Sequence, residues 1–330
     1  MKENYHLTKN GKLVREENTV YYIAEEIGKR PLPVEKIYAL YAYGRISFTS
    51  GVISYLAKNH IPLHFFNYYG YYEGTFYPRE FLVSGDVLVK QVEHYLDNRK
   101  RVEIAREFVR GAAKNIEKNL SYYERSGKDV GAHREKVNEL IDEIDKQYEI
   151  PRLMRVEGAI REAYYSAWDE ILPEEFRFVK RTRQPPENAV NALISFGNSL
   201  MYTSVLTEIY NTQLNPTVSY LHVPSERRFS LSLDISEIFK PIIVDRVIFK
   251  LLNKRILTMD DFSEDLERSI LTDKGRRKFL QEWESKMAET IKHRGLKRNV
   301  SYRSLIRMEC YKLEKHLIGG EKYKPLVMWW

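Results

Sequence analysis

The chain has 330 residues, of which 43% are hydrophobic and 30% are charged, so it can bury a substantial core. Charged residues interrupt every apolar run, and no run reaches the length of a membrane span, which predicts no membrane association. The 53 Lys and Arg exceed the 46 Asp and Glu by 7, a moderate basic excess that is compatible with a nucleic-acid partner.

The cysteine content, the N-terminal residues and the absence of known motifs limit the classes of protein to which the chain can belong. A single cysteine, Cys310, excludes an internal disulfide and a zinc site built from several thiolates. Met1 is followed by the charged Lys2 and Glu3, without the apolar segment of a secretion signal, so we expect a cytoplasmic protein. The sequence has no Walker-type glycine loop, dinucleotide fingerprint or Gly-x-Ser-x-Gly elbow, which argues against an ATPase, a dehydrogenase and a serine hydrolase.

Residues 1–80 have the composition of a β-rich domain. They hold 12 of the 24 tyrosines, and short β-branched and aromatic runs alternate with turn residues. One helix is expected at 49–59, and Asn10-Gly11 predicts a hairpin between the first two strands. The strands are expected at residues 5–8, 12–15, 19–24, 37–43, 61–67 and 71–77. We predict a small β-sandwich-like N-terminal domain.

From Ser84 onward the hydrophobic period changes to that of helices. Leu88, Val92, Tyr95 and Leu96 are spaced as one apolar helix face. The helices are expected at about 84–109, 130–148, 153–171, 185–213, 234–254, 275–293 and 302–317. The fold class is therefore α+β, with domains at residues 1–80 and 81–330, the second larger and all-helical.

The segment from His222 to Glu237 has the densest chemistry in the chain. It holds one histidine and three carboxylates, Glu226, Asp234 and Glu237, and a further carboxylate, Glu157, lies near the start of an earlier helix. Imidazole and carboxylate are ligands for Mg²⁺ or Mn²⁺. The adjacent arginines suit a phosphate-bearing substrate; they are Arg227 and Arg228.

Four of these residues also have a structural explanation. A lone His222 is more often structural than a ligand, and Glu157 can simply stabilise a helix dipole. Asp234 can be the N-cap of the helix expected at 234–254, with Glu237 at the third position completing a capping box. These explanations stay open at the level of sequence.

A second feature is the basic stretch from Lys274 to Lys315, which has 13 Lys and Arg against 5 Asp and Glu. Such a surface could neutralise DNA phosphates and make binding salt-dependent. The candidate DNA contacts in it are Arg276, Arg277 and Lys278. The alternative is an ordinary solvated helix surface, although Trp283, Tyr302 and Tyr311 are interleaved with the charges.

Three blocks of the sequence resemble one known family. They are Glu157-Gly158 followed by Arg161 and Tyr165, the helix from Asn188 to Leu200 with Asn191 and Phe196-Gly197, and the stretch from His222 to Pro241 with Leu233-Asp234, Glu237 and Phe239-Lys240-Pro241. In these blocks the chain resembles the CRISPR-associated integrase/endonuclease of spacer acquisition, the Cas-one family. Lys240 replaces the family's usual Arg, which keeps the charge but loses bidentate geometry.

The resemblance implies a β-rich N-terminal domain that dimerises, a helical catalytic domain, and a divalent metal, Mg²⁺ or Mn²⁺, bound by Glu157, His222 and Glu237. It places Asp234 nearby, and we count Asp234 among the catalytic residues and Arg161 among the DNA contacts. Tyr165 and Asn191 are expected as supporting residues, although Tyr165 can equally be a core aromatic and Asn191 can simply bridge helices. It also implies double-stranded DNA as substrate, a homodimer, and the small Cas-two protein as partner.

The reaction implied is attack on a phosphodiester, by a DNA 3′-hydroxyl in integration of new spacer DNA into a CRISPR array or by water in cleavage. The competing interpretations are a non-catalytic basic DNA-binding protein and a helical scaffold.

Overall fold

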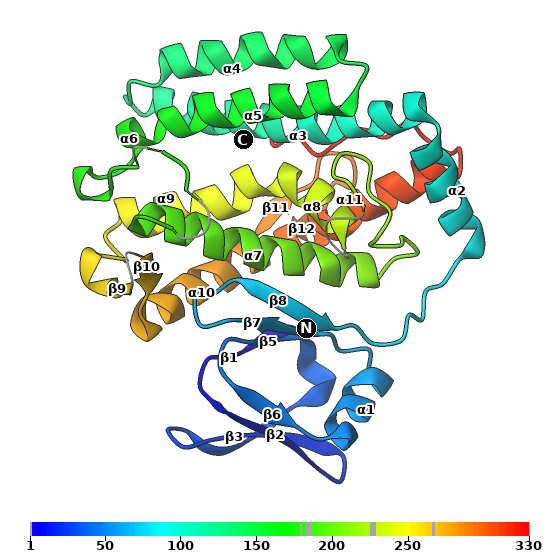
Figure 1. Cartoon of the computed structure of the whole chain (residues 1–330), viewed down its shortest axis with the longest axis vertical. Helices are drawn as coiled ribbons and strands as arrows, with labels where there is room; N and C mark the ends of the chain where they lie inside the picture. The colour runs from blue at the N-terminus through cyan, green and yellow to red at the C-terminus, as the bar shows by residue number, and fades with distance from the viewer. Residues whose placement is uncertain (1, 179, 183–185, 225–228, 266–267, 330) are drawn as a thin grey trace. The chain divides into compact units, whose positions relative to one another are not determined.

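The computed structural model describes the whole chain except residues 1, 179, 183–185, 225–228, 266–267 and 330. The chain forms two compact units, Met1–Val83 and Ser84–Trp330, which are described separately below (Figure 1). The class is α+β, as the sequence predicted. Within the described residues, no helix combines the length and apolar character needed to cross a membrane.

The N-terminal unit consists of two four-stranded sheets and one helix around a common core. The sheet orders are β1-β5-β7-β8 and β4-β3-β2-β6. The strands are β1 (Glu3–Leu7), β2 (Gly11–Glu16), β3 (Thr19–Ala24), β4 (Gly28–Leu32), β5 (Ile37–Ala42), β6 (Ile46–Phe48), β7 (Leu63–Phe66) and β8 (Tyr72–Phe76), and the helix is α1 (Ser50–Lys58). Fully buried side chains from both sheets and from α1, such as Val20, Leu40 and Val52, form one core.

The expected hairpin at Asn10-Gly11 is wrong, because β1 and β2 belong to different sheets. β1 pairs in parallel with β5, and β2 pairs antiparallel with β3. The Asn10 side chain accepts a hydrogen bond from the Arg45 amide at 2.8 Å. A Cβ at Gly11 would lie 2.4 Å from the Ile23 carbonyl oxygen. Asn10 and Gly11 therefore allow two chain segments to approach each other closely, and they do not form a tight turn.

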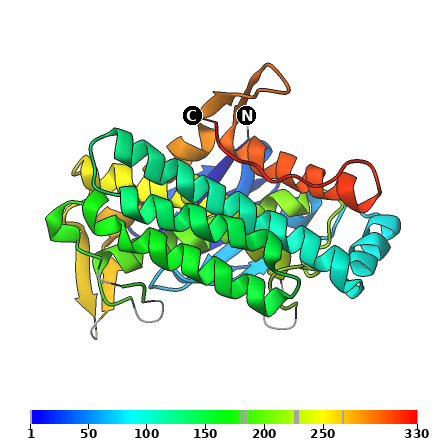
Figure 2. The same cartoon turned by 90° about the horizontal axis from the view of Figure 1, so that it is seen from above.

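The C-terminal unit is built of helices: α2 (Gly85–Leu96), α3 (Asn98–Arg125), α4 (Gly131–Glu143), α5 (Ile150–Ser166), α6 (Trp168–Ile171), α7 (Ala189–Tyr210), α8 (Ser230–Phe239), α9 (Arg246–Asn253), α10 (Asp273–Ala288) and α11 (Tyr302–Leu317). Helices α3, α4 and α5 run alongside one another and each packs against the other two (Figures 1 and 2). Helix α7 is buried on nearly all sides, as its apolar character around the whole circumference requires.

This unit is not all-helical, since it also contains two short hairpins. They are β9 (Phe262–Asp265) with β10 (Arg268–Leu271), and β11 (Thr290–Lys292) with β12 (Asn299–Ser301). The helix expected at 275–293 therefore ends early, at Ala288. Glu289 leaves the helical conformation with ψ 135°, and Thr290 and Ile291, which favour strands, continue as β11.

The helix expected at 234–254 is longer and interrupted. α8 begins at Ser230, so Asp234 lies inside it and is not its N-cap, and the capping-box explanation is wrong. Between α8 and α9 the chain forms a π-helical turn from Lys240 to Asp245, which contains Pro241. Such turns often occur at functional sites. Helix α7 packs closely here, because a Cβ at Gly197 would lie 2.6 Å from Val244 Cγ1.

Candidate catalytic centre

Two of the carboxylates singled out in the sequence meet at one cation. On α5, the Arg161 Nε donates to Glu157 Oε1 at 3.1 Å. The same guanidinium donates through Nη2 to Glu237 Oε2 on α8, and Lys240 Nζ donates to Glu237 Oε1. Helices α5 and α8, far apart in sequence, therefore bring Glu157 and Glu237 to the same guanidinium. Lys240 follows Glu237 by one helical turn and contacts its other oxygen.

His222 is oriented by the fully buried Asp234. The His222 Nδ1 lies 2.8 Å from Asp234 Oδ1, which also accepts the backbone N–H of His222 at 3.0 Å. Asp234 Oδ2 accepts the N–H groups of Tyr220 at 2.6 Å and Leu221 at 3.0 Å. This carboxylate therefore fixes both the loop before α8 and the imidazole. Nδ1 is engaged, and Nε2 has no partner among the described residues.

The surrounding charges set the protonation of this cluster. Burial alone would raise the pKa of Glu237, but the charges of Lys240, Arg161 and His222 outweigh it and lower the pKa to about 2. Burial disfavours the charged form of His222, yet the hydrogen bond and charge of Asp234 raise the imidazole pKa above its ordinary value. Glu237 is therefore an anion at neutral pH, and it lies close enough to His222 for their charges to interact.

The donor set suits a hard divalent cation, but the described side chains do not enclose one. No group of three His, Cys, Asp or Glu residues in the described part of the chain is arranged to hold a metal ion. The Arg161 guanidinium instead bonds to both Glu157 and Glu237. Carboxylate oxygens and an oriented imidazole with Nε2 available remain the ligand types of a Mg²⁺ or Mn²⁺ site.

A buried aspartate that the sequence analysis missed adjoins this cluster. Asp245, at the end of the π-helical turn, is hydrogen-bonded by the Tyr164 hydroxyl, and its Oδ2 is buried without a partner among the described residues. Asn119 on α3 donates to the Tyr164 oxygen at 3.1 Å and to the Pro241 carbonyl at 2.7 Å. Burial raises the pKa of Asp245 to about 7, although the charge of Arg161 opposes the shift.

Comparison with known proteins decides the family. The family model described as "CRISPR associated protein Cas1" matches residues 5–285. The chain belongs to this family. It is 55% identical over its whole length to "CRISPR-associated protein Cas1 1" of Methanobrevibacter ruminantium, covering 99% of that protein. It is 53% identical to "CRISPR-associated endonuclease Cas1" of Methanothermobacter thermautotrophicus, covering all of this chain and 96% of the relative.

Solved structures agree. A CAS1 protein from Thermotoga maritima superposes with a TM-score of 0.89 at 41% identity, over 98% of this chain and 99% of the other. A structure described as "Casposase bound to integration product" shares the fold alone, with a TM-score of 0.88 at 18% identity over 98% of this chain and 93% of that one. The prediction of a Cas-one endonuclease is therefore confirmed, and the protein is an enzyme of this family.

The supporting residues predicted from the sequence lie on the two flanks of the site. Tyr165 is half-buried, with its ring 5.3 Å from that of Phe178 and its hydroxyl within range of the Arg161 charge. Asn191 is buried and holds a loop: its Oδ1 accepts from the Thr182 amide at 3.0 Å and its Nδ2 donates to the Lys180 carbonyl at 3.0 Å. Asn191 is therefore a structural bridge in the described residues.

The predicted DNA contacts differ in their exposure and in their ion pairs. Arg161 is directed to the two carboxylates rather than to solvent, and Arg276 is only 5% exposed. Lys278 pairs with Asp261 at 2.6 Å. Arg277 is exposed. Arg227 and Arg228, and with them Glu226, lie outside the described residues.

Proposed function

We propose that this protein is a metal-dependent DNA endonuclease and integrase that inserts new spacer DNA into a CRISPR array. The observation that carries the proposal is the convergence of Glu157 and Glu237 on Arg161, beside an imidazole that Asp234 holds in place. Family membership supports the reaction class, since the full-length relative from Methanothermobacter thermautotrophicus is named an endonuclease. A non-catalytic DNA-binding protein would have no need of this buried charge arrangement.

Glu157, His222 and Glu237 are the residues that would hold the metal, Mg²⁺ or Mn²⁺. When bound, the ion supplies a Lewis acid for the phosphoryl oxygen and the developing charge on the leaving oxygen. Lys240 and Arg161 keep Glu237 ionised, so this ligand needs no deprotonation at neutral pH. A cation held by Glu157 and Glu237 would take over the carboxylate oxygens that Arg161 now contacts, and the N–H donors of Arg161 would then be available for substrate phosphate oxygens.

The other residues of the site have separate roles. Asp234 accepts the Nδ1 proton of His222 and so directs Nε2 to the ligand position. Tyr165 lies within range of the Arg161 charge, and its ring packs on that of Tyr164 with the ring centres 5.9 Å apart. The nucleophile is a DNA 3′-hydroxyl in integration and water in cleavage, and the phosphodiester is exchanged or hydrolysed at the same centre.

The partners follow the family. We infer that the substrate is double-stranded DNA and that the protein works as a homodimer through its N-terminal unit, with a small Cas-two partner. A casposase that shares this fold is described as bound to an integration product. A Cas6-RT-Cas1–Cas2 complex contains a chain of the same fold, with a TM-score of 0.86 at 17% identity over 36% of that chain. These descriptions support DNA and a Cas-two protein as partners, and the homodimer rests on the family resemblance alone.

The test uses Glu157→Gln, His222→Ala and Glu237→Gln, with Glu162→Gln on the exposed side of α5 as the matched control. Glutamine keeps the volume, so Arg161 and Lys240 are not left in an emptied pocket. We expect each of the three variants to lose at least about a hundred-fold in cleavage and strand transfer with Mn²⁺, in the range for loss of a catalytic group, while DNA affinity is retained.

The control Glu162→Gln should cleave at the wild-type rate. Wild-type cleavage in all three site variants would end the proposal of a metal centre here. Equal loss of DNA binding and of cleavage would favour a binding protein instead.

A further inference from the structure

The β11–β12 hairpin is an ordered arm that stands out from α10 and α11 (Figure 2). Its strands pair antiparallel, with Ile291 opposite Val300. At the tip the His293 amide donates to the Arg298 carbonyl at 2.9 Å, and the Lys297 amide donates to the His293 carbonyl at 2.9 Å. The base is fixed as well, because the Tyr302 amide donates to the Glu289 carbonyl at 3.1 Å and Val300 is buried.

Every ionised side chain on this arm is a cation. From Thr290 to Ser301 the sequence has four Lys and Arg and no Asp or Glu. All four are exposed, and none makes an ion pair with a described residue; they are Lys292, Arg294, Lys297 and Arg298. Arg294 rests against Trp329 of the C-terminal tail, with its guanidinium carbon 5.7 Å from the ring centre. The charges are therefore held on a short, closed ribbon rather than on a loose tail.

The flanking helices differ, since their cations are largely neutralised within the protein. Lys278 pairs with Asp261 at 2.6 Å, Arg303 with Glu284 at 3.1 Å and Arg307 with Glu208 at 2.7 Å. Lys286 pairs with Glu289, just after the end of α10, and Lys312 pairs with Glu309 on its own helix. The hairpin thus carries four of the eight excess positive charges in the stretch from Lys274 to Lys315, and none of the four has an acidic partner among the described residues.

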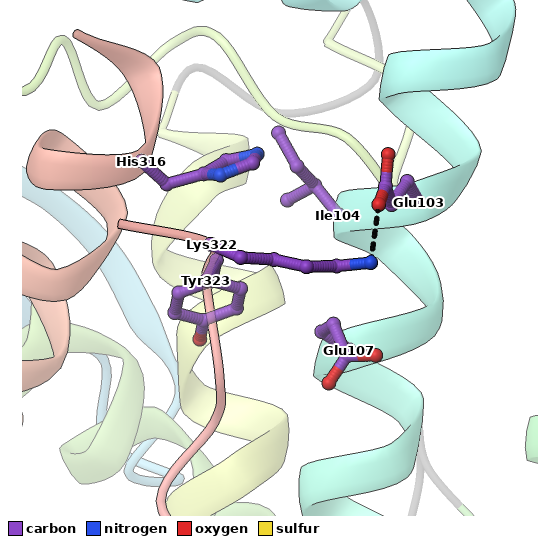
Figure 3. Close-up of a pocket in the computed structure, with 6 residues that line it drawn as sticks. All are labelled: Glu103, Ile104, Glu107, His316, Lys322 and Tyr323. Atoms are coloured by element: carbon purple, nitrogen blue, oxygen red, sulfur yellow. Dashed lines mark ion pairs between the residues drawn. The ribbon is translucent and has the colours of Figure 1, made fainter. Parts of the chain in front are cut away.

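A hollow between α3 and the C-terminal tail offers a useful contrast (Figure 3). Lys322 reaches into it but pairs with Glu103 at 2.7 Å, and Glu107 lies nearby. His316 also lines it, and its pKa is lowered by burial and by the neighbouring His94. An anion therefore meets no net positive charge there, in contrast to the hairpin.

We propose that the β11–β12 hairpin is a phosphate-contacting arm that binds the backbone of DNA without reading its sequence. A narrow two-stranded ribbon with unpaired cations can follow a groove or a strand, and each phosphate that it neutralises releases condensed counterions. The arm carries affinity and not catalysis. This inference rests on the proposed function, because it assigns the binding surface for the substrate of that reaction.

The test is the salt dependence of DNA binding by the full-length chain, measured on a short duplex of arbitrary sequence. The variant neutralises the arm: Lys292→Gln, Arg294→Gln, Lys297→Gln and Arg298→Gln together. Each phosphate contact contributes about 0.9 to the slope of log affinity against log salt, so the slope should fall by up to about 3.6 units. The cleavage rate at saturating DNA should stay at the wild-type value, while the half-saturating DNA concentration rises.

The matched control removes the same charge from exposed, ion-paired positions of other helices: Lys90→Gln, Lys136→Gln, Lys146→Gln and Arg152→Gln. It should keep the wild-type slope to within about one unit. If the arm variant melts early, the pair Lys297→Gln and Arg298→Gln, which leaves the Trp329 contact intact, should give half the effect.

Suppose that the wild-type protein binds and cleaves DNA and that the arm variant shows the same salt slope as the wild type. This result overturns the role of the hairpin and leaves the proposed function standing. An equal fall in slope in the control variant overturns it too, because general charge would then explain the effect. A wild-type protein that neither binds nor cleaves DNA with Mn²⁺ removes the proposed function instead.

Discussion

Asp234 shows how one buried carboxylate connects the loop before α8 to the chemistry of the site. Its two oxygens accept four N–H groups, three from the backbone of residues 220–222 and one from the His222 ring. The spacing in the sequence placed Asp234 near His222 and Glu237 but left open whether it caps a helix or takes part in the site. The structure answers this, because α8 begins four residues earlier and the carboxylate points back to the loop.

We predict that Asp234→Asn weakens Mn²⁺ binding about 10- to 100-fold, the range for loss of a partner that orients a ligand. The asparagine side chain has one oxygen and one NH₂ group, so some of the N–H groups that Asp234 accepts would face another donor. The free energy of unfolding should therefore also fall by about 1–3 kcal/mol. Calorimetric titration with Mn²⁺ and urea unfolding measure the two effects.

Ser219→Ala is the control, because Ser219 donates to the His222 carbonyl at 2.7 Å without touching the ring. It should lose stability but keep most of the Mn²⁺ affinity. Equal Mn²⁺ affinities in the two variants would contradict an orienting role for Asp234.

At the scale of elements, the π-helical turn between α8 and α9 explains why Asp245 was missed. The segment Pro241-Ile242-Ile243-Val244-Asp245 is apolar with a single acid at its end, and helical periodicity contains no sign of a wider turn. The turn sends Asp245 inward beside Tyr164 and within range of Arg161. Its carboxyl is fully buried, so its protonation is coupled to folding.

Asp245 should make the protein less stable as pH rises. Its pKa is raised from 3.8 to about 7 in the fold, mainly by burial, so the folded state holds the proton more tightly than the unfolded state. This contribution is fully present below about pH 4 and is lost as pH rises through about 7. Glu237, with a pKa near 2, acts in the opposite direction and at lower pH. Urea unfolding between pH 5 and pH 8 should show a fall in stability that is smaller in Asp245→Asn, and His222, whose pKa is also raised in the fold, accounts for the part that remains. Parallel curves for the two proteins would rule out this assignment.

The same scale shows what sequence patterns could and could not give. Strand positions such as β3 at Thr19–Ala24 were predicted correctly, because β-branched and aromatic runs mark strands locally. The pairing of the strands was not predicted correctly, because β1 pairs with a strand distant in sequence, with Glu3 opposite Ile37 on β5. On α2 the expected apolar face is exposed, with Leu96 at 74%, whereas Gln91 is buried and bonds to the backbone of Asn215. Periodicity identifies a face but not what covers it.

For the whole molecule, the division into two units has consequences for assembly. Each unit has its own buried core, and the segment from Arg79 to Val83 between them is exposed and has neither helix nor strand. The sequence predicted a boundary near Pro78 from the change of period, which is a local signal. It predicted dimerisation of the N-terminal unit only through the family resemblance, because contacts between copies leave no periodic pattern within one chain.

We predict that limited proteolysis first cuts between Arg79 and Val83, because this exposed segment has no ladder of backbone hydrogen bonds to lose. Mass spectrometry should identify fragments of residues 1 to about 80 and about 80 to 330, and each should melt cooperatively when separated. Light scattering should then give the mass of a dimer for the full chain and for the N-terminal fragment, and of a monomer for the helical fragment. First cuts within α2 or the β11–β12 tip would contradict the boundary, and a monomeric N-terminal fragment beside a dimeric full chain would move the dimer contact to the helical unit.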